Sequence, residues 1–66
     1  MNMGLRLKIK RIELGFRQKE LAIKSGVTSQ CLSNIERGIT KNPNMHVMKK
    51  LSGILGISVQ ELFFQD

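Results

Sequence analysis

The stretch QKELAIKSGVTSQCLSNIER, residues 18–37, decides the fold of this chain of 66 residues. Ala22 is small enough to let a second helix cross close by, and Gly26 can supply the left-handed backbone of a sharp turn. Leu32 and Ile35 then lie at the spacing that anchors the second helix in a core. The stretch therefore predicts two helices joined by a sharp turn.

The outward face of the second helix is polar. At roughly 100° per residue, one side of this helix consists of Ser29, Gln30, Ser33, Asn34 and Arg37, and the opposite side of Thr28, Cys31, Leu32 and Ile35. Gln and Asn can pair bidentately with adenine, Ser can donate or accept, and Arg suits guanine or phosphate. Any amphipathic helix has a polar outer face, but this one lacks the Glu and Lys that solvated helices favour. The face therefore favours contact with base edges of DNA.

Length and composition exclude several classes of protein. A chain of 66 residues predicts one small domain over 1–66, near the lower limit for a core without disulfides or metals. The single Cys excludes an internal disulfide, and one His with one Cys cannot build a zinc site, so no metal or cofactor is expected. There is no membrane-spanning run and no signal-peptide core, which favours the bacterial cytoplasm.

Charge is distributed unevenly along the chain. The net charge is +6, and all eleven Lys and Arg lie within residues 1–50, against three Glu, whereas residues 51–66 carry only Glu61 and Asp66. A protein that lays one side on phosphates gains affinity from a basic end. A merely soluble basic protein is the alternative interpretation.

The apolar pattern predicts five helices. The first runs from about Gly4 to Leu14, the second from Gln18 to Ser25, the third from the cap Thr28 to Gly38, the fourth from the cap Asn44 to Gly56, and the fifth from the capping box Ser58–Glu61. On the first helix one apolar face consists of Met3, Leu7 and Leu14 and the other of Leu5, Ile9 and Ile12. In the later helices the residues expected in the core are Leu21 and Ala22, then Met45, Met48, Leu51 and Leu55, and finally Leu62 with one or both of Phe63 and Phe64. Arg17 is a poor N-cap for the second helix, so the first amides of this helix need other acceptors, and Glu20 is expected to help.

Segments between residues 7 and 62 resemble the phage repressor and Cro family: LKIKR, GFRQKELA, SGVTSQCLSNIERG and NPNMHVMKKLSGILGISVQEL. The resemblance implies an all-α, compact five-helix domain of the lambda-repressor-like type, with a helix-turn-helix formed by its second and third helices. The departures are local, at Arg17, Ile23, Ser25 and Lys49. None of them touches the geometry of the motif.

The family's functional positions imply roles in this chain. Base contacts are expected from Ser29, Gln30, Ser33 and Asn34, and phosphate contacts from Gln18, Thr28, Arg37, Lys41, Asn42 and Asn44. Arg37 has the reach for phosphate, base or a neighbouring side chain. Arg11 and Glu36 occupy positions where the family often has a partly buried ion pair, so a bidentate contact is expected there.

The resemblance implies a transcriptional regulator that binds double-stranded DNA sequence-specifically, reads the major groove with its third helix and acts as a homodimer on a pseudo-palindromic operator. The C-terminal end is the expected dimer seam, because no Lys or Arg follows position 50. The candidates there are Leu55, Ile57, Val59, Phe63 and Phe64. Burial of Phe64 against Leu5, Ile9 and Ile12 within the monomer is the alternative.

Other functions fit the sequence less well. A protein-interaction module, such as an antitoxin or an anti-repressor, would usually carry aromatic or aliphatic anchors on the outward face of the third helix. The chain has no catalytic set, no phosphate loop and no evident small-molecule site, and His46 stands alone, so an enzyme is not expected. Repressor, activator and restriction-modification controller remain open. The ending FFQD offers no linker, so a complete, Cro-sized protein is favoured over part of a longer one.

Overall fold

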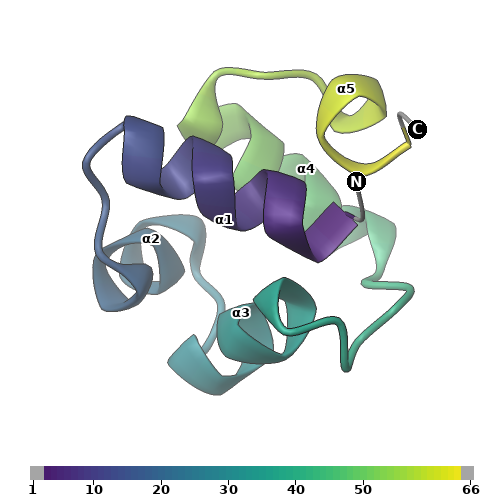
Figure 1. The fold of residues 1–66 in the computed structure, drawn as a ribbon, viewed down its shortest axis with the longest axis horizontal. Helices are drawn as coiled ribbons and strands as arrows, with labels where there is room; N and C mark the ends of the chain where they lie inside the picture. Colours follow the sequence, from purple (N-terminus) through teal and green to yellow (C-terminus); the bar gives the residue numbers. More distant parts are fainter. Residues whose placement is uncertain (1–2, 65–66) are drawn as a thin grey trace.

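The computed structural model describes residues 3–64, and the helices of that range are packed around one core with no strand among them (Figure 1). They are α1 (Met3–Glu13), α2 (Gln18–Ser25), α3 (Ser29–Glu36), α4 (Met45–Leu55) and α5 (Val59–Phe63). The expected all-α architecture is confirmed, and the first helix is displaced by one residue at each end. α1 packs against α3 and α5, while α2 packs against α3 and α4.

Side-chain caps explain where most of the helices begin. The Thr28 hydroxyl accepts from the Cys31 amide at 2.9 Å, the Asn44 side-chain oxygen Oδ1 from the Val47 amide at 2.9 Å, and the Ser58 hydroxyl from the Glu61 amide at 3.1 Å. Each bond satisfies an amide that has no partner within its own helix.

Among the helices whose N-cap residue is described, α2 lacks a side-chain cap, as the sequence predicted. Arg17 offers no side-chain acceptor, and the Glu20 carboxylate instead accepts from the Arg17 amide at 2.9 Å. Gly26 caps the C-terminal end of α2, and its φ of 72° is left-handed, as the sharp turn before α3 requires.

The core contains buried apolar side chains from every helix: Leu7, Leu21, Ala22, Leu32, Ile35, Met48, Leu51, Leu55, Leu62 and Phe63. Cys31 is half-buried and packs against this cluster. The prediction of Met45 as a core residue is wrong, because it is 47% exposed, and Leu14, on the same apolar face of the first helix as Leu7, is 47% exposed as well. Leu14 follows the last residue of α1, and Met45 begins α4 before the helix reaches the core.

The two C-terminal phenylalanines differ in their surroundings. Phe63 is buried, whereas Phe64 follows the end of α5 and is 53% exposed. Phe64 is therefore not buried in the monomer, and the second apolar face of α1, formed by Leu5, Ile9 and Ile12, is exposed as well.

Burial also corrects the list of residues expected at a dimer seam. Leu55 and Phe63 belong to the monomer core, so their side chains leave almost no surface for a partner. Ile57 and Val59 are only partly buried, and Phe64 is exposed.

Gly4 determines how closely α1 approaches the end of α3. A Cβ at residue 4 would lie 2.8 Å from the carbonyl oxygen of Glu36, and closer still to that of Ile35. Both atoms are backbone and have little freedom to move. α1 can therefore lie directly on the C-terminal end of α3 only because residue 4 lacks a side chain.

Gly4→Ala is expected to lower the free energy of unfolding by about 1–3 kcal/mol, the usual cost of overpacking a closed contact. Gly53→Ala is the matched control, because Gly53 lies within α4 and its Cβ would meet no atom within 4 Å. The control is expected to raise the stability by about 0.5–1 kcal/mol, since Ala favours the helix over Gly. Urea unfolding measures both changes, and an unchanged or raised stability for Gly4→Ala would contradict the close contact.

Candidate nucleic-acid interface

α3 presents its polar residues on the side away from Leu32 and Ile35. Ser29 and Gln30 are exposed, and Ser33 and Asn34 are half-buried. The Gln30 side-chain amide donates to the Asn34 side-chain carbonyl oxygen at 2.9 Å. The four residues expected to contact bases therefore share one accessible helix face, and two of them are bonded to each other.

The polar face is held in place by a buried ion pair behind it. Arg11 Nε lies 2.7 Å from Glu36 Oε2, and Arg11 Nη2 donates to Glu36 Oε1 at 3.1 Å. Arg11 Nη1 donates to the carbonyl oxygen of Phe16 at 2.9 Å. The side chains of Arg11 and Glu36 are only 11% and 3% exposed. The expected bidentate contact is thus present, and it joins α1 to the end of α3.

Gln18 extends this network to the start of α2. Its side-chain amide donates to Glu36 Oε1 at 3.3 Å, from the first residue of the helix. Glu36 therefore receives hydrogen bonds from α1 and from α2 while it ends α3. Within the described residues the second N–H of the Gln18 amide is not engaged, and the first backbone amides of α2 have no partner inside the helix.

The segment after α3 is anchored to that helix. The amides of Ile39 and Thr40 both donate to the carbonyl oxygen of Asn34, at 2.9 and 3.1 Å. Arg37, Lys41, Asn42 and Asn44 are exposed, while Pro43 is buried. The segment therefore holds four of the expected phosphate-contacting residues on a fixed backbone next to α3.

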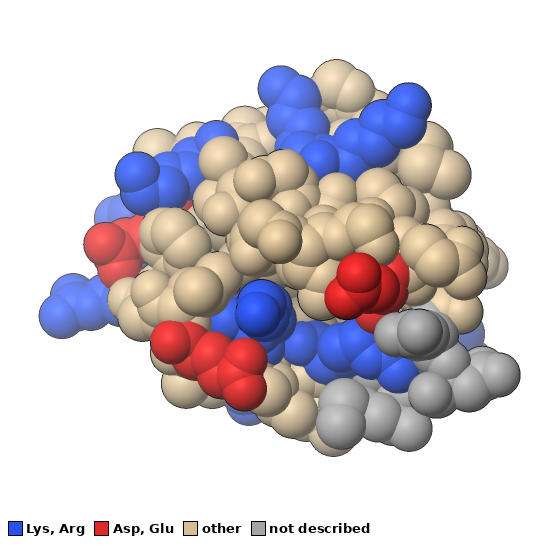
Figure 2. All heavy atoms as spheres, turned by 90° about the horizontal axis from the view of Figure 1, so that it is seen from above, with Lys and Arg blue, Asp and Glu red and all other residues tan. Residues whose placement is uncertain are grey.

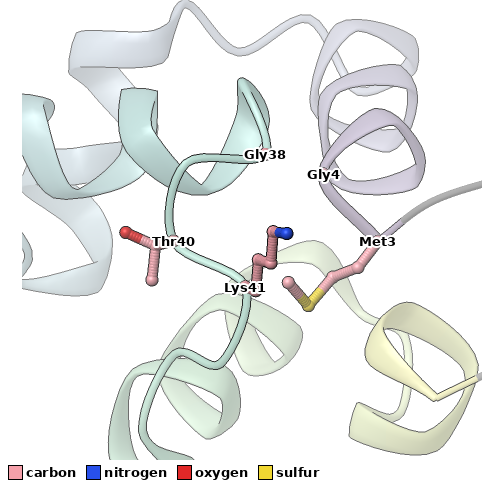
Figure 3. A pocket seen from close by; sticks show the side chains of 5 residues that line it. All are labelled: Met3, Gly4, Gly38, Thr40 and Lys41. Atoms are coloured by element: carbon pink, nitrogen blue, oxygen red, sulfur yellow. The ribbon is translucent and has the colours of Figure 1, made fainter.

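Lys41 borders a shallow hollow where this segment meets the start of α1. The hollow measures about 360 Å³ and is lined by Met3, Gly4, Gly38, Thr40 and Lys41. In Figure 3 the side chains of Lys41 and Met3 lie in the hollow, while the Thr40 side chain points away from it. Among its lining residues the hollow has one cation, Lys41, and no carboxylate.

Basic side chains are not confined to the side of α3. Figure 2 looks onto the opposite side of the molecule, where uncharged groups cross the middle and Lys and Arg lie around them, with Asp and Glu in separate places. The basic half of the sequence thus does not form a single basic face. The charged residues of α1 contribute to this spread, because they are nearly consecutive in the sequence and therefore point in different directions around the helix.

Two polar contacts in this region were not predicted from the sequence. The bond between Gln30 and Asn34 could have been found, because residues four apart lie on the same side of a helix. The bond between Gln18 and Glu36 joins residues that are 18 positions apart, and no local signal indicates it.

The described part of the chain, residues 3–64, offers no group of three His, Cys, Asp or Glu side chains that could hold a metal ion. Within the same range, no helix has the length and apolar character needed to cross a membrane.

A family model described as helix-turn-helix matches residues 7–62. The chain belongs to this family, in its repressor and Cro branch. The transcriptional regulator SinR of Bacillus subtilis is 42% identical over 60 residues, which are 91% of this chain and 54% of SinR. The chain thus spans about half the length of the curated relatives it matches.

Solved structures agree with this assignment. A crystal structure of SinR in complex with DNA has a TM-score of 0.88 at 42% identity, covering 91% of this chain and 95% of that one. The P22 c2 repressor in complex with a synthetic operator has a TM-score of 0.92 at 33% identity, covering 100% of this chain and 98% of that one. The five helices are thus those of lambda-repressor-like domains.

Glu36→Gln is expected to lower the free energy of unfolding by about 3 kcal/mol, because it strands the buried Arg11 guanidinium. Replacing both partners, Arg11→Met with Glu36→Leu, is expected to stay within about 1 kcal/mol of wild type, since no charge is left unpaired. Urea unfolding at neutral pH measures both variants.

Glu13→Gln removes an exposed carboxylate near the end of α1 and serves as the matched control, with an expected change below about 0.5 kcal/mol. Equal stability of Glu36→Gln and wild type would show that the pair has no structural role.

Proposed function

We propose that this chain is a module that binds double-stranded DNA sequence-specifically in a transcriptional regulator, and that α3 reads the major groove. The observation that carries the proposal is the outer face of α3, where uncharged donors and acceptors are accessible together. Such groups match the pattern of base edges in the major groove. The solved complexes of SinR and of the P22 c2 repressor with DNA support this assignment. If so, the chain acts in the cytoplasm of a bacterial cell, at the nucleoid.

Phosphate contacts are assigned to the residues around α3. Gln18 retains a free N–H at the start of α2, and Lys41 offers an ammonium group beside the hollow at the start of α1. Thr28 and Asn44 use an oxygen as helix caps, which leaves the hydroxyl hydrogen of Thr28 and the amide hydrogens of Asn44 free to donate. Asn42 and Arg37 complete the set on the exposed segment. These groups fix the register of α3 on the duplex, and they carry no sequence information.

A protein-interaction role is less well supported. The accessible face of α3 carries no aromatic or aliphatic anchor, because Leu32 and Ile35 are buried in the core. Central anchors of that kind dominate protein interfaces. An electrophoretic mobility assay against a library of bacterial DNA fragments separates the two functions, since a module that binds only protein would shift no fragment.

Lys41→Ala and Gln30→Ala are expected to weaken DNA binding in different ways. Lys41→Ala should weaken binding to all sequences about equally and reduce the salt slope of log K by about one unit, because one phosphate contact is lost. Gln30→Ala should cost about 1–3 kcal/mol on the best site and relax the preference at one base pair of each half-site. Fluorescence anisotropy at several salt concentrations measures both effects.

Lys10→Ala is the matched control for Lys41→Ala. Lys10 lies in α1 beside a second hollow that it shares with Ile57, not on the segment after α3. Its loss should change the salt slope less than the loss of Lys41 does. A selective loss for Lys41→Ala together with a uniform loss for Gln30→Ala would reverse the assignment of the two residues.

We further propose that the chain binds as a homodimer on a pseudo-palindromic site. A single module of this size contacts only a few base pairs, which is too little sequence to specify one site in a genome. Ile57, Val59 and Phe64 remain as seam candidates after the fold removes Leu55 and Phe63. The half-sites are then expected about 34 Å apart, on one face of the duplex.

Phe64→Ser is expected to weaken self-association at least about tenfold, because it removes a large apolar side chain from the proposed seam. Ile23→Ser is the matched control, since Ile23 is exposed in α2 and lies outside the seam. Sedimentation equilibrium measures the monomer–dimer constant, and footprinting measures the length of the protected DNA. A monomer at high concentration that protects one unrepeated half-site would exclude the dimer.

A further inference from the structure

The two amide side chains of α3 that face outward are bonded to each other. Gln30 Nε2 donates to Asn34 Oδ1 at 2.9 Å, across one turn of the helix. This bond commits one of the two N–H groups of Gln30 and one lone pair of Asn34. It therefore limits which base-edge atoms each side chain can still contact.

The donor and acceptor of the Gln30 side chain that are not used in this bond match a single base. They consist of one N–H and the carbonyl oxygen, and adenine presents the complementary pair in the major groove, an N7 acceptor beside an N6 donor. Guanine presents two acceptors, N7 and O6, and Gln30 has only one N–H left for them. The bond to Asn34 thus makes Gln30 selective for adenine over guanine.

The uncommitted groups of Asn34 have a different character. Both N–H groups remain free, while its carbonyl oxygen already accepts from Gln30. Asn34 is thus mainly a donor, suited to the O4 of thymine or to the N7 and O6 of guanine. Its backbone carbonyl also accepts from the amides of Ile39 and Thr40, which fixes this turn of α3.

We infer that Gln30 and Asn34 act as one hydrogen-bonded unit, in which Asn34 holds the Gln30 amide in the orientation that selects adenine at one position of each half-site. Asn34 itself donates to an acceptor on a neighbouring base pair. Because Asn34 restrains the Gln30 side chain, less of its conformational freedom is lost when it contacts a base. This inference rests on the proposed function, and it adds the identity of one recognised base.

The test is selection of bound duplexes from a random library by wild type, Gln30→Ala, Asn34→Ala and Asn34→Asp. Wild type should enrich adenine at one position, and Gln30→Ala should lower that preference at least about fivefold. Asn34→Ala should lower the adenine preference at the same position, because Gln30 is no longer held. Asn34→Asp retains an acceptor for Gln30, so it should keep the adenine preference even though its carboxylate weakens overall affinity near phosphates.

A chemical probe checks the contact on the selected site. Replacing the selected adenine by 7-deazaadenine removes the N7 acceptor and should weaken wild-type binding about three- to tenfold, the loss expected for one hydrogen bond. The same replacement should leave the affinity of the Gln30→Ala variant for the site unchanged. Gln60→Ala removes an exposed Gln from α5 and should yield the wild-type motif, and thermal melting confirms that each variant is folded.

The outcomes separate this inference from the function on which it rests. A wild-type motif with guanine at the position that depends on Gln30, or with adenine that is insensitive to Asn34→Ala, would overturn the coupled unit while leaving DNA recognition intact. Enrichment of no sequence by the wild-type protein would overturn the proposed function and the inference with it.

Discussion

The Glu36 carboxylate is the point on which the arrangement of the first three helices depends. It ends α3, it is bound bidentately by Arg11 of α1, and it accepts from Gln18 at the start of α2. Gly4 adds a steric condition, because it lets α1 lie against the backbone of the same end of α3. Replacing buried ion pairs by apolar residues is often neutral for stability. The value of this pair thus lies in setting how α2 and α3 are oriented.

Orientation matters here because the proposed contacts with DNA come from different parts of the chain. Gln18 begins α2, the residues proposed to contact bases occupy α3, and Lys41 follows in the next segment. Phosphate contacts can position a recognition helix only if the distances among these groups are constant. The network at Glu36 fixes the distance between Gln18 and α3. The two amides bonded to the Asn34 backbone carbonyl fix the distance between α3 and the segment that carries Lys41. The same residues thus build the fold and set the geometry of the interface.

In a chain this small, several polar side chains serve two purposes. Thr28 and Asn44 cap α3 and α4, and each retains hydrogens with which to donate to a phosphate. Gln30 and Asn34 are proposed to contact bases, and they also restrain each other. Some apolar side chains, in contrast, have no role in the core. The exposed ones include Leu5, Ile9, Ile12 and Phe64, although residues of these types are normally buried. The core is small, and α1 can bury only one of its apolar sides.

The sequence by itself determined what depends on neighbouring residues: the five helices, the caps at Thr28, Asn44 and Ser58, the turn at Gly26 and the polar face of α3. These features follow from helical periodicity and from hydrogen bonds that span three or four positions. The contact between Arg11 and Glu36 was predicted through family resemblance, because the two residues are 25 positions apart. Only the tertiary structure decided that Phe63 is buried and Phe64 exposed, that Gly4 meets α3, that Gln18 bonds Glu36 and that the basic residues are spread over several sides. Each of these depends on how the helices are placed relative to one another, and that placement results from packing of the whole core.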